Sequence, residues 1–140
     1  MLPAFSLVIP AFNEAHRIGD TLVQVLSYVR TASAGSEVIV VDDGSSDGTA
    51  EVVRSAFASA GEIESRLIQH SPNRGKGAAV RDGLRAATRP IALFSDADLS
   101  TPIEEAPKLL EPINAGESDV AFGSRALDRK LIGTRQSWGR

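Results

Sequence analysis

The chain has 140 residues, of which 42% are hydrophobic and 24% are charged, a composition typical of one globular domain with a hydrophobic core. Its formal net charge is -3 and its basic residues are dispersed, which argues against a nucleic-acid-binding surface. It has no cysteine, so disulfide bonds, thiolate metal sites and cysteine nucleophiles are excluded.

No segment of the sequence has the pattern of a membrane anchor or a secretion signal. The longest purely apolar run, residues 38–41, is far shorter than the roughly 20 residues that cross a bilayer. The first residues also lack a basic region followed by an apolar core. We therefore expect this chain to be neither secreted by its own signal nor anchored by its own helix.

Strands and helices are expected to alternate along the chain. Compact apolar or β-branched runs predict buried strands, and apolar residues at intervals of three and four predict helices. The expected strands are 6–10, 37–41, 66–70 (a shorter edge strand), 91–94 and 119–123, and the expected helices are about 14–30, 52–60, 77–88 and 102–113. This order predicts an α/β fold, a doubly wound and mostly parallel sheet with right-handed crossovers.

The third expected helix is built of small residues, namely Ala78, Ala79, Gly83, Ala86 and Ala87. Small side chains allow the backbone of a helix to approach a sheet closely. We therefore expect this helix to lie tightly against the sheet.

Polar clusters follow four of the expected strands, at residues 10–14, 42–47, 96–98 and 123–125. In open parallel sheets, ligands bind beyond the carboxyl ends of the strands. All four clusters are expected at that edge, so the sequence predicts one shared site there.

Asp96 and Asp98 end the 91–94 strand with one residue between them. In an extended chain, alternation would point both carboxylates to the same side. Two like charges held close together favour a divalent cation, and Mg2+ or Mn2+ commonly binds one or two carboxylates plus substrate phosphates. Alone, an Asp-x-Asp sequence is more often a solvated turn.

The other clusters also have structural alternatives. Residues 42–44 form either a strand-end turn with helix-capping side chains or an acceptor for a base or ribose. Glu14 is either a first-turn helix charge or a nucleotide contact. Residues 74–77 are either a solvated basic loop or a loop that faces phosphate or base, and Arg125 is either a surface arginine or the cation that balances a diphosphate.

Five motifs occur in a fixed order along the chain: VIPAFNE (8–14), VVDDGSSDGT (40–49), NRGKG (73–77), DAD (96–98) and GSR (123–125). In this order they resemble the motifs of inverting family-2 glycosyltransferases with the GT-A fold. The DAD motif and the following Leu-Ser-Thr-Pro are similar to the dolichyl-phosphate glucosyltransferase and polyprenyl-phosphate glycosyltransferase branch. The resemblance implies a Rossmann-like nucleotide-sugar-binding fold, truncated at its carboxyl end, with residues 1–140 as the N-terminal part of a catalytic domain.

The resemblance also implies roles for individual residues. Pro10, Phe12 and Glu14 would line the base and ribose. Tyrosine is usual at position 12, so Phe12 keeps the stacking face and lacks the hydroxyl. Asp43 would pair with the base, and Asp42 and Lys76 would take part in nucleotide-sugar binding. Asp96 and Ala97 would contact the ribose or sugar, Asp98 would bind Mg2+ or Mn2+, and Arg125 would contact the phosphates. The implied catalytic residues are Asp96, Asp98 and Arg125.

The expected reaction transfers a hexose, glucose favoured, from a nucleoside-diphosphate sugar, UDP-glucose favoured, to a polyprenyl phosphate with inversion. A phosphate acceptor is already anionic, so no strong general base is required. His16 and His70 are accordingly expected to be surface or structural residues. The full-length protein is expected at the cytoplasmic face of a membrane, which it would contact only through other segments or through the lipid acceptor.

Two alternatives stay open, and a third is disfavoured. A family-2 transferase acting on a sugar hydroxyl would need an Asp or Glu base outside these residues. The chain can also bind a donor without turnover. A phosphoacceptor signalling domain is disfavoured, because its acidic pair usually follows the first strand, whereas Asp42 and Asp43 follow the second.

Overall fold

The computed structural model describes residues 1–123 of the chain. Its sheet has four parallel strands in the order β3-β2-β1-β4. The strands are β1 (Phe5–Ala11), β2 (Glu37–Asp42), β3 (Glu64–Gln69) and β4 (Ile91–Phe94), and the helices are α1 (Ile18–Ala32), α2 (Thr49–Ala58), α3 (Lys76–Ala86), the 3-10 turn η1 (Ile103–Glu105) and α4 (Ala106–Asn114). The predicted α/β architecture is confirmed, including β3 as an edge strand.

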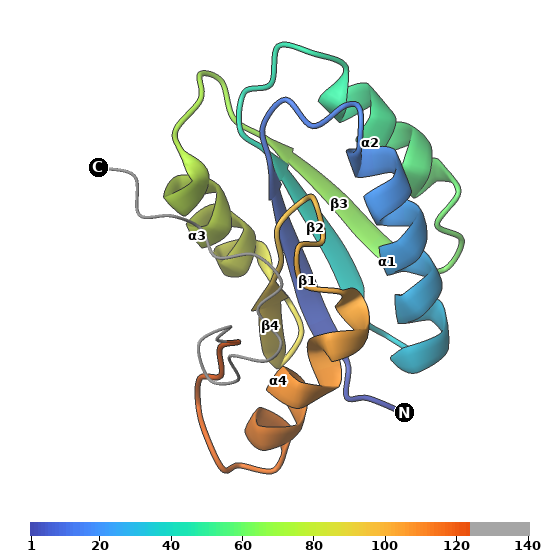
Figure 1. Ribbon diagram of the computed structural model, residues 1–140, viewed down its shortest axis with the longest axis vertical. Helices are drawn as coiled ribbons and strands as arrows, with labels where there is room; N and C mark the ends of the chain where they lie inside the picture. Colours follow the sequence, from blue (N-terminus) through green and yellow to red (C-terminus); the bar gives the residue numbers. More distant parts are fainter. Residues whose placement is uncertain (124–140) are drawn as a thin grey trace.

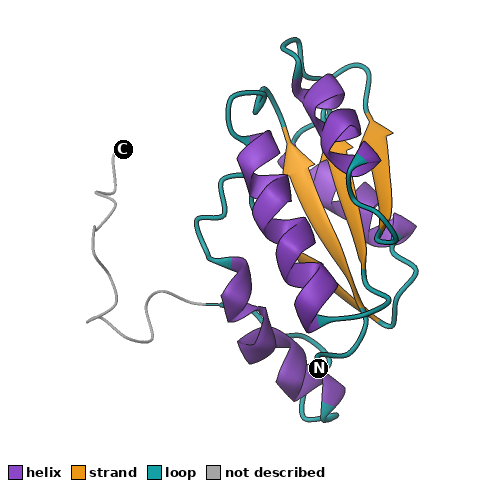
Figure 2. Ribbon diagram, turned by 90° about the vertical axis from the view of Figure 1, so that its right-hand side faces the viewer, coloured by secondary structure: helices purple, strands orange, loops and turns teal. Residues whose placement is uncertain are grey.

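Helices cover both faces of the sheet (Figures 1 and 2). The main core lies between β1, β2, α1, α2 and the η1–α4 segment, and includes the fully buried Leu7, Ile9 and Leu22. A smaller core of Val8, Ile39, Val41 and Ala79 lies between the other face and α3. Because both faces are covered, every residue of β1 and β2 is buried, which explains why their sequences are apolar without alternation.

The first helix begins at Ile18, four residues after its predicted start at about residue 14. Residues 14–17 form a turn, and the first helical residue is Ile18, whose N–H donates to the carbonyl of Glu14 at 2.8 Å. The N–H of Glu14 donates to Oγ1 of Thr49, the first residue of α2, and the N–H of Ala15 donates to Oδ2 of Asp47 in the loop after β2. These contacts hold the segment ahead of the helix as a turn.

The prediction of a strand at residues 119–123 is wrong within the described structure. This segment pairs with no strand of the described sheet, and its large apolar side chains Val120 and Phe122 are 75% and 83% exposed. An apolar run forms a strand only where an adjacent strand supplies backbone partners, which a local sequence pattern does not reveal.

Helix α3 lies close against β1 and β2, as its small residues predict. A Cβ atom on Gly83 would lie 2.3 Å from Val8 Cγ1 and 3.0 Å from Val41 Cγ2. We therefore expect Gly83→Ala to lower the free energy of unfolding in urea by about 1–3 kcal/mol through overpacking. On the same helix, a Cβ on Gly77 meets nothing within 4 Å, so Gly77→Ala should raise that free energy by up to about 1 kcal/mol. Equal effects of the two changes would contradict the close packing.

A buried carboxylate ties together the amino ends of the strands. Glu37 accepts hydrogen bonds from the Ser6 hydroxyl, from the Thr88 N–H (2.6 Å) and hydroxyl (2.9 Å), and from Arg66 (2.9 Å). Burial raises the pKa of the Glu37 carboxyl, but these hydrogen bonds and the Arg66 charge hold the pKa below its ordinary value. The carboxylate therefore stabilises the fold in its ionised form.

We expect Glu37→Gln to lower the free energy of unfolding by about 1–3 kcal/mol at pH 7, because its amide donor would face the donors of Thr88. Since the pKa of Glu37 is lower in the folded chain than in the unfolded chain, its contribution is complete above about pH 5 and is lost as the pH falls through the folded-state value. The free energy of unfolding, measured in urea, should differ less between wild type and Glu37→Gln at pH 3 than at pH 7. Glu64→Gln, at a side chain 51% exposed, is the control and should change stability by less than about 0.5 kcal/mol.

Candidate functional site

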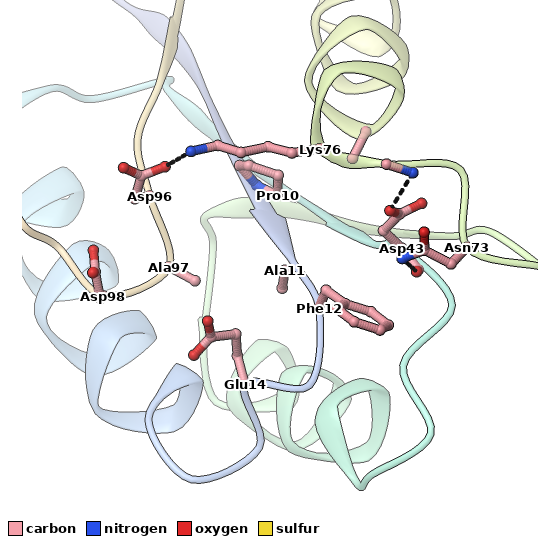
Figure 3. A pocket seen from close by; sticks show the side chains of 12 residues that line it. Pro10, Ala11, Phe12, Glu14, Asp43, Asn73, Lys76, Asp96, Ala97 and Asp98 are labelled. Carbon is pink, nitrogen blue, oxygen red and sulfur yellow. Dashed lines mark hydrogen bonds and ion pairs between the residues drawn. The ribbon is translucent and has the colours of Figure 1, made fainter. Parts of the chain in front are cut away.

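A cavity of about 510 Å³ opens at the carboxyl ends of β1, β2 and β4 (Figure 3). The strand order places β2 on one side of β1 and β4 on the other, so the cavity lies at the topological switch point of the sheet, where ligands of α/β folds bind. Its volume suits a small-molecule ligand of nucleotide size. The lining residues are Pro10, Ala11, Phe12, Glu14, Asp43, Asn73, Gly75, Lys76, Ala79, Asp96, Ala97 and Asp98.

Most of the predicted site residues lie around this one cavity. They come from three strand ends and from the start of α3, and are Pro10, Phe12, Glu14, Asp43, Lys76, Asp96, Ala97 and Asp98. Asp42 is not among the lining residues: it is buried, and its Oδ1 accepts the N–H of Ser45 at 3.1 Å, which closes the turn after β2. Arg125 lies outside the described residues.

Asp43 is the most tightly held side chain of the site. Its Oδ1 lies 2.7 Å from His70 Nδ1 and accepts the N–H of Arg74 at 2.9 Å, and its Oδ2 accepts the N–H of Gly75 at 2.8 Å. Burial raises the pKa of the Asp43 carboxyl, but the hydrogen bonds outweigh it and lower the pKa overall. Asp43 is therefore a fixed, ionised acceptor at the cavity wall.

Gly44 allows the loop after β3 to approach the end of β2. Its φ is +76°, and a Cβ there would lie 2.6 Å from the backbone nitrogen of Asn73. The amide of Asn73 in turn donates to the carbonyl oxygen of Asp43 at 2.9 Å. Glycine at position 44 is thus required for this wall of the cavity.

The loop after β2 also fixes the loop after β1. Ser45, Asp47 and Thr49 accept the N–H groups of residues 13, 15 and 14 at 2.8, 3.1 and 3.0 Å. Asp47 Oδ1 also accepts the N–H of Thr49, the first residue of α2, at 3.0 Å, so this loop both caps the helix and binds the loop after β1. These hydrogen bonds to residues 13–15 fix the segment that carries Phe12 and Glu14.

Phe12 and Glu14 border the cavity from the end of β1 (Figure 3). The Phe12 side chain is 50% exposed, so its ring presents an open face to a planar ligand. Glu14 Oε2 pairs with Arg17 Nε at 2.8 Å, which keeps its carboxylate beside the first turn of α1.

Asp96 and Asp98 reach the cavity through a turn rather than through strand alternation. Strand β4 ends at Phe94, the Leu99 N–H donates to the Asp96 carbonyl at 3.1 Å, and Leu99 has a φ of +47°. The Thr21 hydroxyl of α1 donates to the Ala97 carbonyl at 2.6 Å. This turn, held against α1 by the Thr21 hydrogen bond, places both carboxylates at the cavity.

The carboxylates fit a cation that arrives with a diphosphate better than a resident metal. Asp98 is exposed, and one of its oxygens accepts the Ser100 N–H at 2.9 Å, whereas Asp96 pairs with Lys76 across the cavity. Within residues 1–123, no group of three or more acidic or histidine side chains could enclose a metal ion. Mg2+ and Mn2+ commonly take one or two carboxylates and complete their shell with water and phosphate oxygens.

Sequence reasoning missed several residues that build the site. Asn73 and Gly75 belong to the NRGKG motif, but their contacts to Asp43 follow from the packing of that loop on β2. Thr21 lies in α1, and Asp82 lies in α3, where its Oδ2 is 2.9 Å from Nε2 of His70, the neighbour of Asp43. Both helices have ordinary amphipathic patterns, and no local signal marks these two residues. Among residues 1–123, no helix is long and apolar enough to cross a membrane.

Known proteins resemble this chain in sequence, and solved structures resemble it in fold. The chain is 38% identical to a dolichyl-phosphate beta-glucosyltransferase of Drosophila melanogaster over 93% of its own length and 43% of that protein. The mannosyltransferase PcManGT from Pyrobaculum calidifontis, solved in complex with GDP-Man and Mn2+, superimposes with a TM-score of 0.66 at 30% identity, covering 75% of this chain and 30% of that one.

A third similar structure is glucosyl-3-phosphoglycerate synthase from Mycobacterium tuberculosis in complex with Mn2+, UDP and glucosyl-3-phosphoglycerate. It gives a TM-score of 0.59 at 28% identity and covers 79% of this chain and 39% of that chain. The parallel sheet described here is thus that of the GT-A fold. Residues 6–136 match the model of glycosyl transferase family 2, and the chain belongs to that family.

Proposed function

We propose that residues 1–140 form the N-terminal, nucleotide-sugar-binding part of a glycosyltransferase that moves glucose from UDP-glucose to a dolichyl or other polyprenyl phosphate. The observation that carries this proposal is the convergence of three strand ends and the start of α3 on one cavity. The choice of sugar and acceptor is supported by the dolichyl-phosphate beta-glucosyltransferase relative. The chain spans 43% of that relative, so the activity of the whole protein is itself part of the proposal.

The donor's base is proposed to lie between Phe12 and Asp43. The exposed ring of Phe12 offers a stacking face, and the ionised Asp43 accepts a hydrogen bond from a ring N–H. Uracil and guanine present such an N–H beside their carbonyl group. The similar solved structures hold UDP in one case and GDP-Man in another, which makes the preference between these two bases the decisive measurement.

The diphosphate is proposed to lie between Asp98, Asp96 and Lys76. Asp98, with Asp96 beside it, would hold Mg2+ or Mn2+, which supplies charge stabilisation to the leaving diphosphate when bound. The Lys76–Asp96 ion pair is exposed, with side chains 62% and 42% accessible, and such pairs contribute at most about 1 kcal/mol. Its partners can therefore separate at low cost, which lets Lys76 turn to a phosphate and Asp96 to the sugar side.

The proposed transfer inverts the anomeric carbon. An oxygen of the acceptor phosphate forms the new bond to that carbon from the face opposite the diphosphate, whose own bond to the carbon breaks. No proton has to be removed from an anionic phosphate, so the site needs no histidine base. Arg125, outside the described residues, is proposed to steady the departing phosphates.

The full-length protein is proposed to act at the cytoplasmic face of a membrane. The chemical reason for a membrane surface is that a water-soluble donor must meet a lipid-linked acceptor. Segments outside this chain, or the acceptor itself, would supply the membrane contact.

The proposal is tested by thermal-shift measurements on the 140-residue chain with UDP, GDP and ADP, each with and without Mn2+. We expect UDP with Mn2+ to raise the Tm most and ADP to have little effect. A larger effect of GDP would move the proposal to a guanosine donor, and no response to any nucleotide would contradict the site. A transfer assay with UDP-glucose and dolichyl phosphate then separates turnover from donor binding alone, which is the narrower alternative for this chain.

A further inference from the structure

His70 is a buried histidine that the proposed transfer does not use. It directly follows β3 and is 8% exposed. Its Nδ1 lies 2.7 Å from Asp43 Oδ1, and its Nε2 lies 2.9 Å from Asp82 Oδ2 on α3. The ring therefore bridges a cavity-lining carboxylate and a carboxylate outside the cavity.

Both contacts can be hydrogen bonds donated by the ring only when the ring is charged. Only the imidazolium donates from both nitrogens; a neutral imidazole donates from one nitrogen and turns a lone pair toward the other carboxylate. The hydrogen bond and charge of Arg81 lower the pKa of Asp82, and hydrogen bonds outweigh burial in lowering that of Asp43. Both carboxylates thus stay ionised over the pH range in which histidines titrate.

Two carboxylates contact the His70 ring, and two arginines contact one of these carboxylates. Asp43 contacts the ring from the end of β2, and Asp82 contacts it from α3 through Oδ2. Arg74 binds the same Oδ2 of Asp82 at 2.9 Å, and Arg81 binds its Oδ1 at 3.1 Å. Arg74 also donates its backbone N–H to Asp43. The ring and Arg74 therefore link the end of β2, the loop before α3, and α3 itself.

We propose that His70, braced by Asp82, is a positioning residue whose proton holds Asp43 in the orientation that binds the donor's base, so that donor binding weakens as His70 loses its proton. This inference rests on the proposed function, in which Asp43 receives the base. Loss of the proton leaves a lone pair facing one of the two carboxylates at less than 3 Å. Either Asp43 or its brace must then move.

The test measures UDP affinity by calorimetry with Mn2+ between about pH 5.5 and pH 8.5, in wild type and in His70→Asn. At each pH the ratio of the two affinities cancels the ionisation of the nucleotide and of its metal complex. We expect wild type to bind about tenfold more tightly at the acid end and this ratio to fall toward one at the alkaline end. The chain has two histidines, so the protonation of His70 can be followed separately by NMR, and the ratio should fall over the same interval.

Two further variants complete the test. His16→Asn removes the other, exposed histidine and should keep the wild-type affinity and pH profile. Asp82→Asn removes the brace at a side chain 22% exposed and should shift the protonation of His70, and the fall in affinity, to lower pH. This variant also keeps the proposal testable should His70→Asn fail to fold.

The outcomes separate the two proposals. A ratio that stays constant with pH, or a His70 protonation curve that is identical in wild type and Asp82→Asn, would show a structural role only and overturn this inference. If wild type binds neither UDP nor GDP at any pH, the proposed function fails and this inference fails with it. Normal binding with a constant ratio overturns the role of His70 alone.

Discussion

Replacing Asp98 with asparagine is expected to abolish the Mn2+-dependent part of UDP binding. The Asp98 side chain is exposed at the cavity, and its partner Asp96 is engaged by Lys76, so Asp98 is the carboxylate best placed to meet a diphosphate-bound cation. An amide oxygen is a far weaker ligand for a hard cation than a carboxylate. We expect a loss of at least about 100-fold in affinity in the presence of Mn2+, measured by calorimetry.

The same variant should fold normally, which makes the result easy to interpret. The asparagine oxygen can still accept the N–H of Ser100, and exposed substitutions change stability by about 0.5 kcal/mol or less. Asp20→Asn, an exposed acidic residue in the first turn of α1 and outside the cavity, is the matched control and should bind as wild type. Undiminished Mn2+-dependent binding by Asp98→Asn would refute the assignment of Asp98 as the metal ligand.

The sheet and the position of the site could be predicted from local patterns. Strands β1 and β2 are buried on both faces, so their sequences are continuous apolar runs that cannot be amphipathic helices of normal length. Parallel strands then place every strand end at one edge, so the sequence predicts that residues 10–14, 42–47 and 96–98 share a site. Members of each of these segments line the cavity. The physical reason is that the topology of alternating strands and helices leaves few arrangements.

What could not be predicted depends on contacts between distant segments. Asp42 and Asp43 are adjacent and chemically identical, yet only Asp43 lines the cavity, while Asp42 closes a turn with Ser45. His70 lies 27 residues from Asp43 and 12 from Asp82, and no local pattern links such positions. Residues 119–123 have the composition of a strand but find no partner strand within the described chain.

The loss caused by Asp43→Asn should be as large as that of Asp98→Asn, but it should be independent of metal. Asp43 receives two backbone N–H groups and faces His70, so both of its oxygens act as acceptors. An asparagine supplies one acceptor and must turn its NH2 group toward one of these partners. We expect UDP affinity to fall by about 100-fold or more with or without Mn2+, and the free energy of unfolding to fall by about 2–3 kcal/mol.

The effect of Asp43→Asn on stability should depend on pH, and Asp42→Asn is its control. Because the folded state lowers the pKa of Asp43, its stabilisation is complete above the ordinary value of about 4 and is lost as the pH falls through the folded-state value. The stability difference between wild type and Asp43→Asn in urea should therefore narrow in acid. Asp42→Asn can still accept the N–H of Ser45 through its amide oxygen, so it should keep nearly normal UDP affinity. Only Asp43 of this pair lines the cavity. The reverse result, in which Asp42→Asn loses UDP binding and Asp43→Asn retains it, would therefore mean that this cavity does not hold the base.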